Sequence, residues 1–255
     1  MQICEEAKLI ETNELSDGIF EMYIKTRVAS YAKPGQFVMV YPKDSATLLP
    51  RPISICEVSD GELRLVYRAQ GKGTKEFSLY KEGETVKILG PLGNGFPVEE
   101  GKGKRSILIG GGIGVPPILE LAKALKGEDV TILAGYRNRD MFLDEDFKKQ
   151  APLEVATEDG SVGVKGNVMD VIREKNLKCD VIYACGPMPM LRAIKKYAEE
   201  NGVTAYISLE ERMACGVGAC LGCVCKTTHK DSHSHVNNAR VCTEGPVFEA
   251  SEVEI

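Results

Sequence analysis

The stretch "SILIGGGIGVPPILELAKAL", residues 106–125, decides the fold class of this chain. It begins with the uncharged run of a buried strand and continues through a glycine-rich turn. Ile118, Leu121 and Leu125 then recur at helical spacing. A strand followed by a tight turn and a helix is the repeating unit of α/β proteins. The stretch therefore predicts a parallel sheet in the middle of the chain.

The strand pattern returns further along the chain. The additional predicted strands cover residues 129–135, 153–157, 180–186 and 204–209, with a helix over residues 188–200. Strands that alternate with helices are typical of a parallel sheet covered on both faces.

The first hundred residues have a different pattern. Short runs rich in β-branched and aromatic residues are separated by turns such as "KPGQ", "SDGE" and "KEGE". The predicted strands cover residues 18–26, 35–41, 51–58, 62–69 and 85–90. This spacing is typical of an antiparallel barrel or sandwich.

The change of pattern divides the chain into three parts. We expect an antiparallel β domain over residues 1–98 and an α/β nucleotide-binding domain over residues 99–209. A cysteine-rich segment covers residues 210–255, and residues 90–105 are a candidate linker. The expected fold class is a β barrel plus an α/β domain.

Composition excludes several functional classes. A net charge of -5 argues against a nucleic-acid-binding protein, which normally carries a basic surface. The N-terminal residues lack the apolar run of a signal peptide. The longest uncharged run, residues 106–119, is too short to span a bilayer, so no membrane partner is expected. Nine cysteines, five of them in the last fifth of the chain, favour a reducing cytoplasm with one local thiol site.

Two glycine turns predict a nucleotide site. The first, "GGGIGVPP" at residues 110–117, resembles a dinucleotide-binding loop, but Pro117 stands where the third glycine should be. For this loop taken alone, a tight strand-to-helix turn that binds no ligand remains an alternative interpretation. The second turn, "CGPMPM" at residues 185–190, also joins a strand to a helix. Both turns follow the carboxyl ends of strands, where ligands bind in open parallel sheets.

The cysteine-rich segment predicts a metal centre. Cys215, Cys220 and Cys223 have the spacing C-x4-C-x2-C, which is typical of a plant-type [2Fe-2S] cluster, and Cys242 follows at a distance. We prefer Cys242 as the fourth ligand because Cys223 and Cys225 would crowd one another, although geometry alone does not exclude Cys225. Structural zinc is the main alternative, but zinc sites more often use two C-x2-C pairs.

The chain resembles the electron-transfer subunits of type B dihydroorotate dehydrogenases, within the ferredoxin–NADP reductase superfamily. The resemblance runs essentially end to end. It is carried by "RPISI" (51–55), "VYRAQGKGT" (66–74), "GGGIGVPP", "CGPMPML", and "LEERMACGVGACLGCVC" through "RVCTEGPVF". The cysteine-rich part is the most specific of these motifs.

The resemblance implies FAD in the β domain, NAD in the α/β domain and a [2Fe-2S] cluster in residues 210–255. The implied FAD-binding residues are Arg51, Pro52, Ile53, Ser54, Val66, Tyr67, Arg68, Gly73 and Thr74. The implied NAD-binding residues are Gly110, Gly111, Gly112, Gly114, Cys185, Gly186 and Pro187. Cys185 is about equally well explained as a small packing residue. Arg51 and Arg68 can pair with phosphate oxygens. The resemblance implies no general acid or base.

The resemblance also implies an electron-transfer circuit and a partner. NADH and FAD exchange a hydride, and FAD exchanges single electrons with the cluster. The cluster connects to the FMN of a separate subunit that oxidises dihydroorotate to orotate in pyrimidine biosynthesis, with NAD as the physiological acceptor. The implied assembly is a heterotetramer of two plus two subunits in the cytoplasm.

Two features depart from the family pattern. The span before Cys242 is long and contains His229, His233 and His235, which we expect on an exposed loop extension, with a weak metal site as the alternative. Arg137 and Arg139 follow the second strand of the α/β domain, where a 2′-phosphate could be recognised. NADP therefore remains an alternative to NAD.

Two other functions remain alternatives. One is a flavin/iron–sulfur NAD(P)H reductase with a different partner, such as the small subunit of a ferredoxin-dependent transhydrogenase. The other is a nucleotide-sensing module with structural zinc, which would be colourless and free of flavin.

Overall fold

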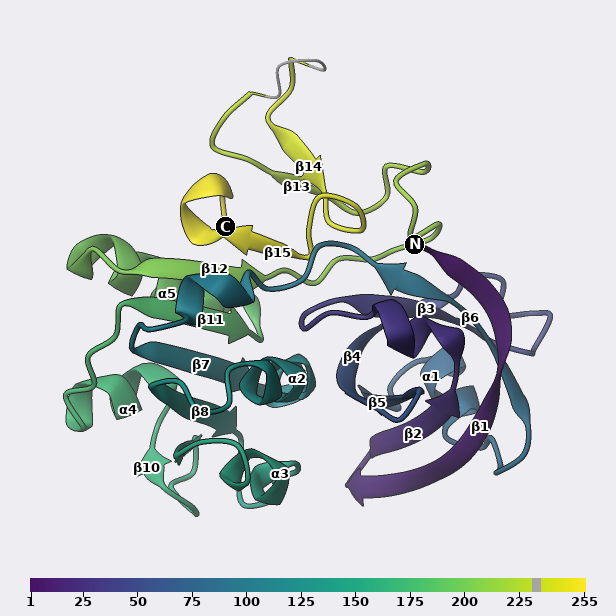
Figure 1. Cartoon of the computed structure of the whole chain (residues 1–255), viewed down its shortest axis with the longest axis horizontal. Coiled ribbons are helices and arrows are strands. Elements are labelled where there is room, and N and C mark those ends of the chain that lie inside the picture. Colours follow the sequence, from purple (N-terminus) through teal and green to yellow (C-terminus); the bar gives the residue numbers. More distant parts are fainter. Residues whose placement is uncertain (231–234) are drawn as a thin grey trace.

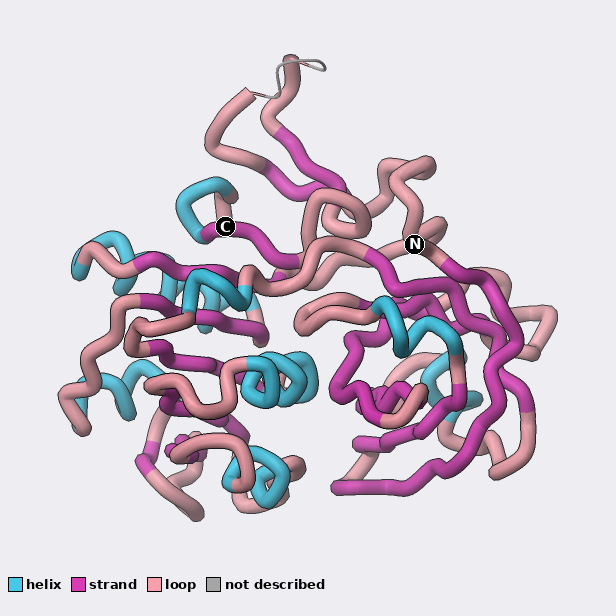
Figure 2. The backbone as a smooth tube through the Cα atoms, in the orientation of Figure 1, coloured by secondary structure: helices cyan, strands magenta, loops and turns pink. Residues whose placement is uncertain are grey.

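A computed structural model describes residues 1–230 and 235–255 of the chain. Figure 1 shows a barrel beside an open sheet, with the C-terminal segment lying above both. Strands form the barrel and the open sheet, and helices accompany both, as Figure 2 shows. None of the helices in these described residues combines the length and apolarity needed to cross a bilayer.

The N-terminal half is a closed barrel of six strands in the order β1-β2-β5-β4-β3-β6. The strands are β1 (Ile3–Ser16), β2 (Ile19–Lys25), β3 (Phe37–Tyr41), β4 (Arg51–Ser59), β5 (Glu62–Arg68) and β6 (Thr85–Leu92). All neighbouring pairs are antiparallel. The expected antiparallel β domain is therefore confirmed, and it is a barrel rather than a sandwich.

The second half is a seven-stranded sheet in the order β10-β9-β8-β7-β11-β12-β15. Its strands are β7 (Ser106–Gly111), β8 (Val130–Tyr136), β9 (Leu153–Thr157), β10 (Val164–Lys165), β11 (Val181–Cys185), β12 (Thr204–Ser208) and β15 (Val247–Glu249). Every pairing is parallel except β12 with β15, which is antiparallel. The predicted parallel sheet is confirmed.

Helices cover both faces of this sheet. They are α2 (Pro116–Ala124), α3 (Asp144–Lys148), α4 (Val168–Glu174) and α5 (Met188–Asn201). Ile107 and Ile109 of β7 share a core with α4 and α5, whereas Leu108 between them shares a core with α2 and α3. This alternation is what a strand buried on both sides requires.

Several elements were not predicted, among them α3, α4 and β10, and three further differences bear on how the parts of the chain are joined. The 14-residue strand β1 was not predicted, because "ICEEAKLIETNELS" carries four acidic residues and only one of its faces is buried. The candidate linker at residues 90–105 is partly ordered, since β6 continues to Leu92 and a 3-10 helix, η2, spans Val98–Gly101. Strand β15 shows that the cysteine-rich segment extends the sheet of the second half.

The remaining elements are short. They are η1 (Arg27–Tyr31), α1 (Lys72–Phe77), η3 (Gly112–Gly114), β13 (Val224–Lys226), β14 (Asn238–Arg240) and η4 (Ala250–Glu252).

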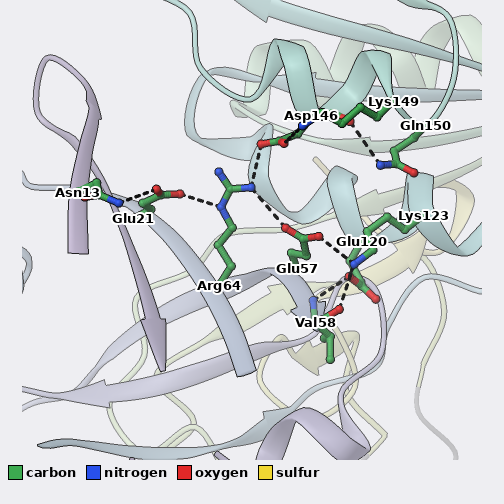
Figure 3. Close-up of polar contacts among 10 residues, drawn as sticks. All are labelled: Asn13, Glu21, Glu57, Val58, Arg64, Glu120, Lys123, Asp146, Lys149 and Gln150. Atoms are coloured by element: carbon green, nitrogen blue, oxygen red, sulfur yellow. Dashed lines mark hydrogen bonds and ion pairs between the residues drawn. The ribbon is translucent and has the colours of Figure 1, made fainter. Parts of the chain in front are cut away.

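A charged network joins the barrel to the helices of the second half (Figure 3). The Arg64 guanidinium on β5 contacts Glu21 at 2.7 Å, Glu57 at 3.3 Å and Asp146 of α3 at 2.8 Å. Lys123 of α2 contacts Glu57 at 2.9 Å. Because Arg64 and Glu21 are only 7% and 6% exposed, their contact is shielded from water. The Arg64–Asp146 and Lys123–Glu57 contacts hold one half against the other.

Candidate functional site

One end of the barrel forms a cationic cavity. A space of about 350 Å³ is lined by Ala46, Thr47, Leu48, Leu49, Arg51 and Lys72. Arg51 Nη1 donates to the carbonyl of Leu49 at 2.6 Å, which fixes the guanidinium. Its other flank lies against Gly73, where an added Cβ would stand 3.0 Å from Nε. Two cations and a bare glycine backbone beside a cavity are a donor set suited to phosphate oxygens.

Strand β4 divides its predicted flavin residues between two faces. Ile53 is buried in the barrel core, while Pro52 and Ser54 alternate with it and are half-buried on the opposite face. Pro52 and Ser54 are therefore the side chains of this strand that a ligand outside the barrel can reach.

Thr74 is engaged in the turn before α1. Its hydroxyl accepts the amides of Gln70 and Gly71, each at 3.1 Å, and donates to the Gly71 carbonyl at 3.2 Å. Thr74 therefore shapes the turn that brings Gly73 against Arg51.

The three predicted residues of β5 do not share a face. Val66 packs on the outside of the barrel with the α2 core, and Arg68 is exposed. The Tyr67 side chain instead lies inside the barrel against Phe77, with ring centroids 6.0 Å apart. Its hydroxyl is buried without a hydrogen-bond partner among the described residues, and burial raises the pKa of Tyr67.

The structure brings the two glycine turns together. Strands β7 and β11 are neighbours, with Gly110 opposite Cys185. A Cβ on Gly114 would lie 2.4 Å from the carbonyl oxygen of Cys185, and one on Gly111 would lie 3.1 Å from Pro187 Cδ. Only glycine permits this approach. The two turns therefore form one continuous surface at the carboxyl edge of the sheet.

Two positions complete this edge. Gly112 has a φ of 54°, and an added Cβ there would meet nothing within 4 Å, so this backbone faces open space. Burial raises the pKa of Cys185 to about 12, and a hydrogen bond with Ser208 only partly offsets the effect. Cys185 is therefore a neutral thiol at pH 7.

Arg137 and Arg139 are exposed on the loop after β8.

The four predicted ligand cysteines meet in two pairs. The Cys220 amide donates to Cys215 Sγ at 3.4 Å, and the Cys242 amide donates to Cys223 Sγ, also at 3.4 Å. The Gly218 amide hydrogen-bonds to Cys242, which links the two pairs. Two sulfurs for each of two irons is the donor set of a [2Fe-2S] cluster. Within residues 1–230 and 235–255, no three His, Cys, Asp or Glu side chains are grouped to hold a single metal ion.

The electrostatics of the cysteine loop favour a thiolate. Burial raises the pKa of Cys215, but backbone hydrogen bonds from Val217, Cys220 and Ala219 outweigh burial and lower the pKa to about 6. Burial and the neighbouring Cys223 raise the pKa of Cys242 to about 11. Bare amides directed at sulfur are what a cluster with anionic ligands requires.

Cys225 differs from these four residues. It lies in β13 opposite Ala239 of β14 and is half-buried. Burial raises its pKa, and the nearby charges that act on it are Glu211 and Glu244 rather than another cysteine. Its surroundings are those of a strand residue.

The long span before Cys242 leads from β13 to β14. His229 and His235 are exposed in this span, and His233 lies outside the described residues.

The cysteine loop lies directly on the barrel. A Cβ on Gly216 would stand 2.7 Å from Met39 Cγ of β3 and 3.0 Å from Leu92 Cδ1 of β6. Met39 is in turn paired with Pro52 of β4. Neighbouring strands are about 4.8 Å apart, so one strand spacing separates the loop contact from the predicted flavin face.

Sequence reasoning missed two sets of residues near the predicted sites. Loop residues 46–49 line the cavity beside Arg51, and Arg240, Thr243 and Glu244 surround Cys242. The adjacent "RVCTEG" gave a usable signal, because an arginine and a glutamate flank a ligand cysteine there.

Sequence comparison extends these observations over the whole chain. A family model for the iron–sulfur cluster binding domain of dihydroorotate dehydrogenase B matches residues 210–254. The electron transfer subunit of dihydroorotate dehydrogenase B (NAD(+)) from Bacillus velezensis is 45% identical over 251 residues, covering 95% of this chain and 96% of that protein. The subunit of the same name from Bacillus cereus strain AH187 is 45% identical over 255 residues, covering 96% of each.

Structural comparison agrees. The NADH-dependent reduced ferredoxin-NADP oxidoreductase, solved for its flavin-based electron bifurcation, superposes with a TM-score of 0.87 at 30% identity, covering 98% of this chain and 90% of that one. The Amycolatopsis cytochrome P450 reductase GcoB shares the fold, with a TM-score of 0.67 at 21% identity over 78% of this chain and 66% of that one. From these matches and the cysteine geometry, the chain belongs to the family of electron transfer subunits of dihydroorotate dehydrogenase B.

Proposed function

We propose that this chain carries electrons between NAD and the FMN of a separate subunit that oxidises dihydroorotate in pyrimidine biosynthesis. The observation that carries the proposal is the convergence of Cys215, Cys220, Cys223 and Cys242, two by two, on a loop packed against the barrel. The cofactors are FAD, a [2Fe-2S] cluster and NAD. When bound, they exchange a hydride at the nicotinamide and flavin and single electrons at the cluster.

The barrel residues hold and orient the flavin in this proposal. Arg51 and Lys72 neutralise phosphate charge at the cavity, and Thr74 preserves the turn that exposes Gly73. Pro52 and Ser54 border the ring system. Tyr67 supports the barrel from inside and does not touch the ligand through its side chain.

The glycine turns hold the nicotinamide nucleotide. Gly110 to Gly114 and the Cys185–Pro187 turn present backbone close to the ligand because no side chain intervenes. Cys185 stays a neutral thiol, so it adds no charge where a hydride moves.

We infer the division of labour along the chain from the same residues. Residues 1–98 bind FAD, residues 99–209 bind NAD and residues 210–255 bind the cluster. A reducing cytoplasm suits the four ligand cysteines, because an oxidising compartment would pair them as disulfides.

The partner subunit docks beside the cysteine loop in this proposal. Val217 and Leu221 flank Cys220 and are 43% and 64% exposed, which is unusual for large apolar side chains so close together. Leu221 also has a φ of 55°, a backbone conformation that folding alone disfavours for leucine. A heterotetramer of two plus two subunits would bury two such surfaces.

The first test is an anaerobic absorbance spectrum with metal analysis, before and after NADH is added. About one flavin and two irons per chain, bleached by NADH, support the proposal. The partner assay then measures NADH formation from dihydroorotate with the FMN subunit present. A colourless chain that contains zinc after anaerobic purification overturns the proposal.

The transhydrogenase alternative is less well supported. The structural match to the NADH-dependent reduced ferredoxin-NADP oxidoreductase has 30% identity, against 45% for the dihydroorotate dehydrogenase subunits. Failure of the partner assay with an intact flavin and cluster would favour it.

A further inference from the structure

An ion pair brackets the fourth ligand cysteine. The backbone amide and Nε of Arg240 both donate to Glu244 Oε2 at 2.8 Å. The Arg240 carbonyl accepts the amides of Thr243 at 3.0 Å and Glu244 at 2.8 Å. Cys242 lies inside this turn, so both charged residues are two positions from it in the chain.

The free end of the guanidinium lies beside the turn between the first two ligand cysteines. Arg240 Nη1 lies 3.4 Å from the Cβ position of Gly218, in the turn between the first two ligand cysteines. Arg240 therefore lies between the turn that carries Cys242 and the turn that joins Cys215 to Cys220.

Stability alone does not explain this arrangement. The side chains of Arg240 and Glu244 are 42% and 41% exposed, and exposed ion pairs contribute little to folding. Their position in the turn that carries Cys242, with Arg240 also beside Gly218, instead makes them the source of a local electric field at the ligand cysteines. Such a field acts on the charge that a cluster gains when it is reduced by one electron.

We propose that Arg240 and Glu244 are opposed positioning charges that set the reduction potential of the cluster held by the four cysteines. Arg240 stabilises the reduced, more negative cluster and raises its potential, whereas Glu244 destabilises it and lowers the potential. The inference rests on the proposed function, because it requires the cluster.

The test is a redox titration of the full-length chain with its cluster and flavin, followed by electron paramagnetic resonance of the reduced cluster. Arg240→Gln removes the positive charge and leaves Glu244, so the equilibrium constant for reduction falls about tenfold, or about 59 mV for one electron. Glu244→Gln leaves Arg240 unopposed, so the constant rises by a similar factor. The double variant returns close to the unmodified chain.

The control is Arg105→Gln. Arg105 forms a similarly exposed pair with Asp180 at 2.7 Å, where β7 and β11 begin, at the opposite end of these strands from the glycine turns. This variant should leave the potential unchanged. It separates a local field from the general effect of removing one positive charge.

The outcomes distinguish the inference from the proposed function. Absence of the cluster signal from the unmodified chain refutes the proposed function. A normal signal with unshifted potentials, or with both single variants shifted in the same direction, refutes only the inference. If Arg240→Gln does not retain iron, Glu244→Gln still decides by itself, because its potential must rise.

Discussion

The buried charge that joins the two halves of the molecule leads to the sharpest stability prediction. Replacing Arg64 with methionine keeps the length and apolar stem of the side chain but removes its charge. Glu21, whose side chain is 8% exposed and 2.7 Å from Arg64, then stays buried without its partner. Breaking a buried pair in this way costs about 3–5 kcal/mol. We therefore expect Arg64→Met to lower the free energy of unfolding by about 4 kcal/mol.

The other partners of Arg64 increase this cost. Burial disfavours the ionised form of Asp146, but its hydrogen bond with Arg64 outweighs burial and holds the pKa of Asp146 below its ordinary value. Asp146 and Glu57 are 30% and 27% exposed, so water can partly compensate them, unlike Glu21. Most of the loss should therefore come from Glu21.

Urea denaturation followed by circular dichroism measures the effect. With an m-value of about 2 kcal/mol/M, a loss of about 4 kcal/mol moves the midpoint by about 2 M. The matched control is Arg27→Met, because Arg27 pairs with Glu5 at 2.7 Å but is 72% exposed, and its removal should cost less than about 1 kcal/mol.

A second variant tests the cause. Arg64→Met combined with Glu21→Gln leaves no uncompensated charge at this position and should recover part of the lost stability. Equal midpoints for Arg64→Met and Arg27→Met, or no recovery in the double variant, would refute the reasoning.

Three further predictions concern the separate sites. Cys242→Ser should abolish cluster binding while Cys225→Ser retains two irons per chain, measured by iron and sulfide analysis; the reverse pattern would exchange their roles. Gly114→Ala places a Cβ 2.4 Å from the Cys185 carbonyl and should raise the KM for NADH at least tenfold in flavin reduction assays, and an unchanged KM would contradict the shared nucleotide surface. Hydrogen bonds from Arg105 lower the pKa of Asp180 from 3.8 to about 2. The contribution of the ionised Asp180 to stability is therefore present above pH 4 and lost as the pH falls towards 2. Asp180→Asn should flatten the stability profile in that window, as measured by thermal unfolding, and an unaltered slope would show that the pair contributes nothing.

Local patterns predicted those parts of the fold that depend on neighbouring residues. The "SILIGG" run gave β7, and "MPMLRAIKKYAEE" gave α5, because one is buried on all sides and the other on a single helical face. Strand β1 was missed because it carries four acidic residues, three of them exposed, along a long barrel strand. Strand β15 was missed because three residues carry no periodic signal, and only pairing with β12 makes them a strand.

The candidate site shows the same division. The C-x4-C-x2-C spacing indicated that Cys215, Cys220 and Cys223 share one loop, which glycine permits at Gly216 and Gly218 with φ values of 70° and 79°. Cys242 is 19 residues from Cys223, so spacing alone did not identify it. The residue pattern of β5 did not indicate that the Tyr67 side chain points into the barrel. That depends on the register of β5 against β2 and β4, which distant residues decide.

The position of the cysteine loop explains why the three parts form one molecule. Gly216 contacts Met39 and Leu92 of the barrel, while β15, only a few residues beyond Cys242, is paired with β12 of the sheet. The cysteine-rich segment is therefore attached to both halves, and its ligand cysteines lie where these attachments meet. Electron transfer requires a fixed separation between sites. A segment attached to the barrel on one side and to the sheet on the other can keep that separation.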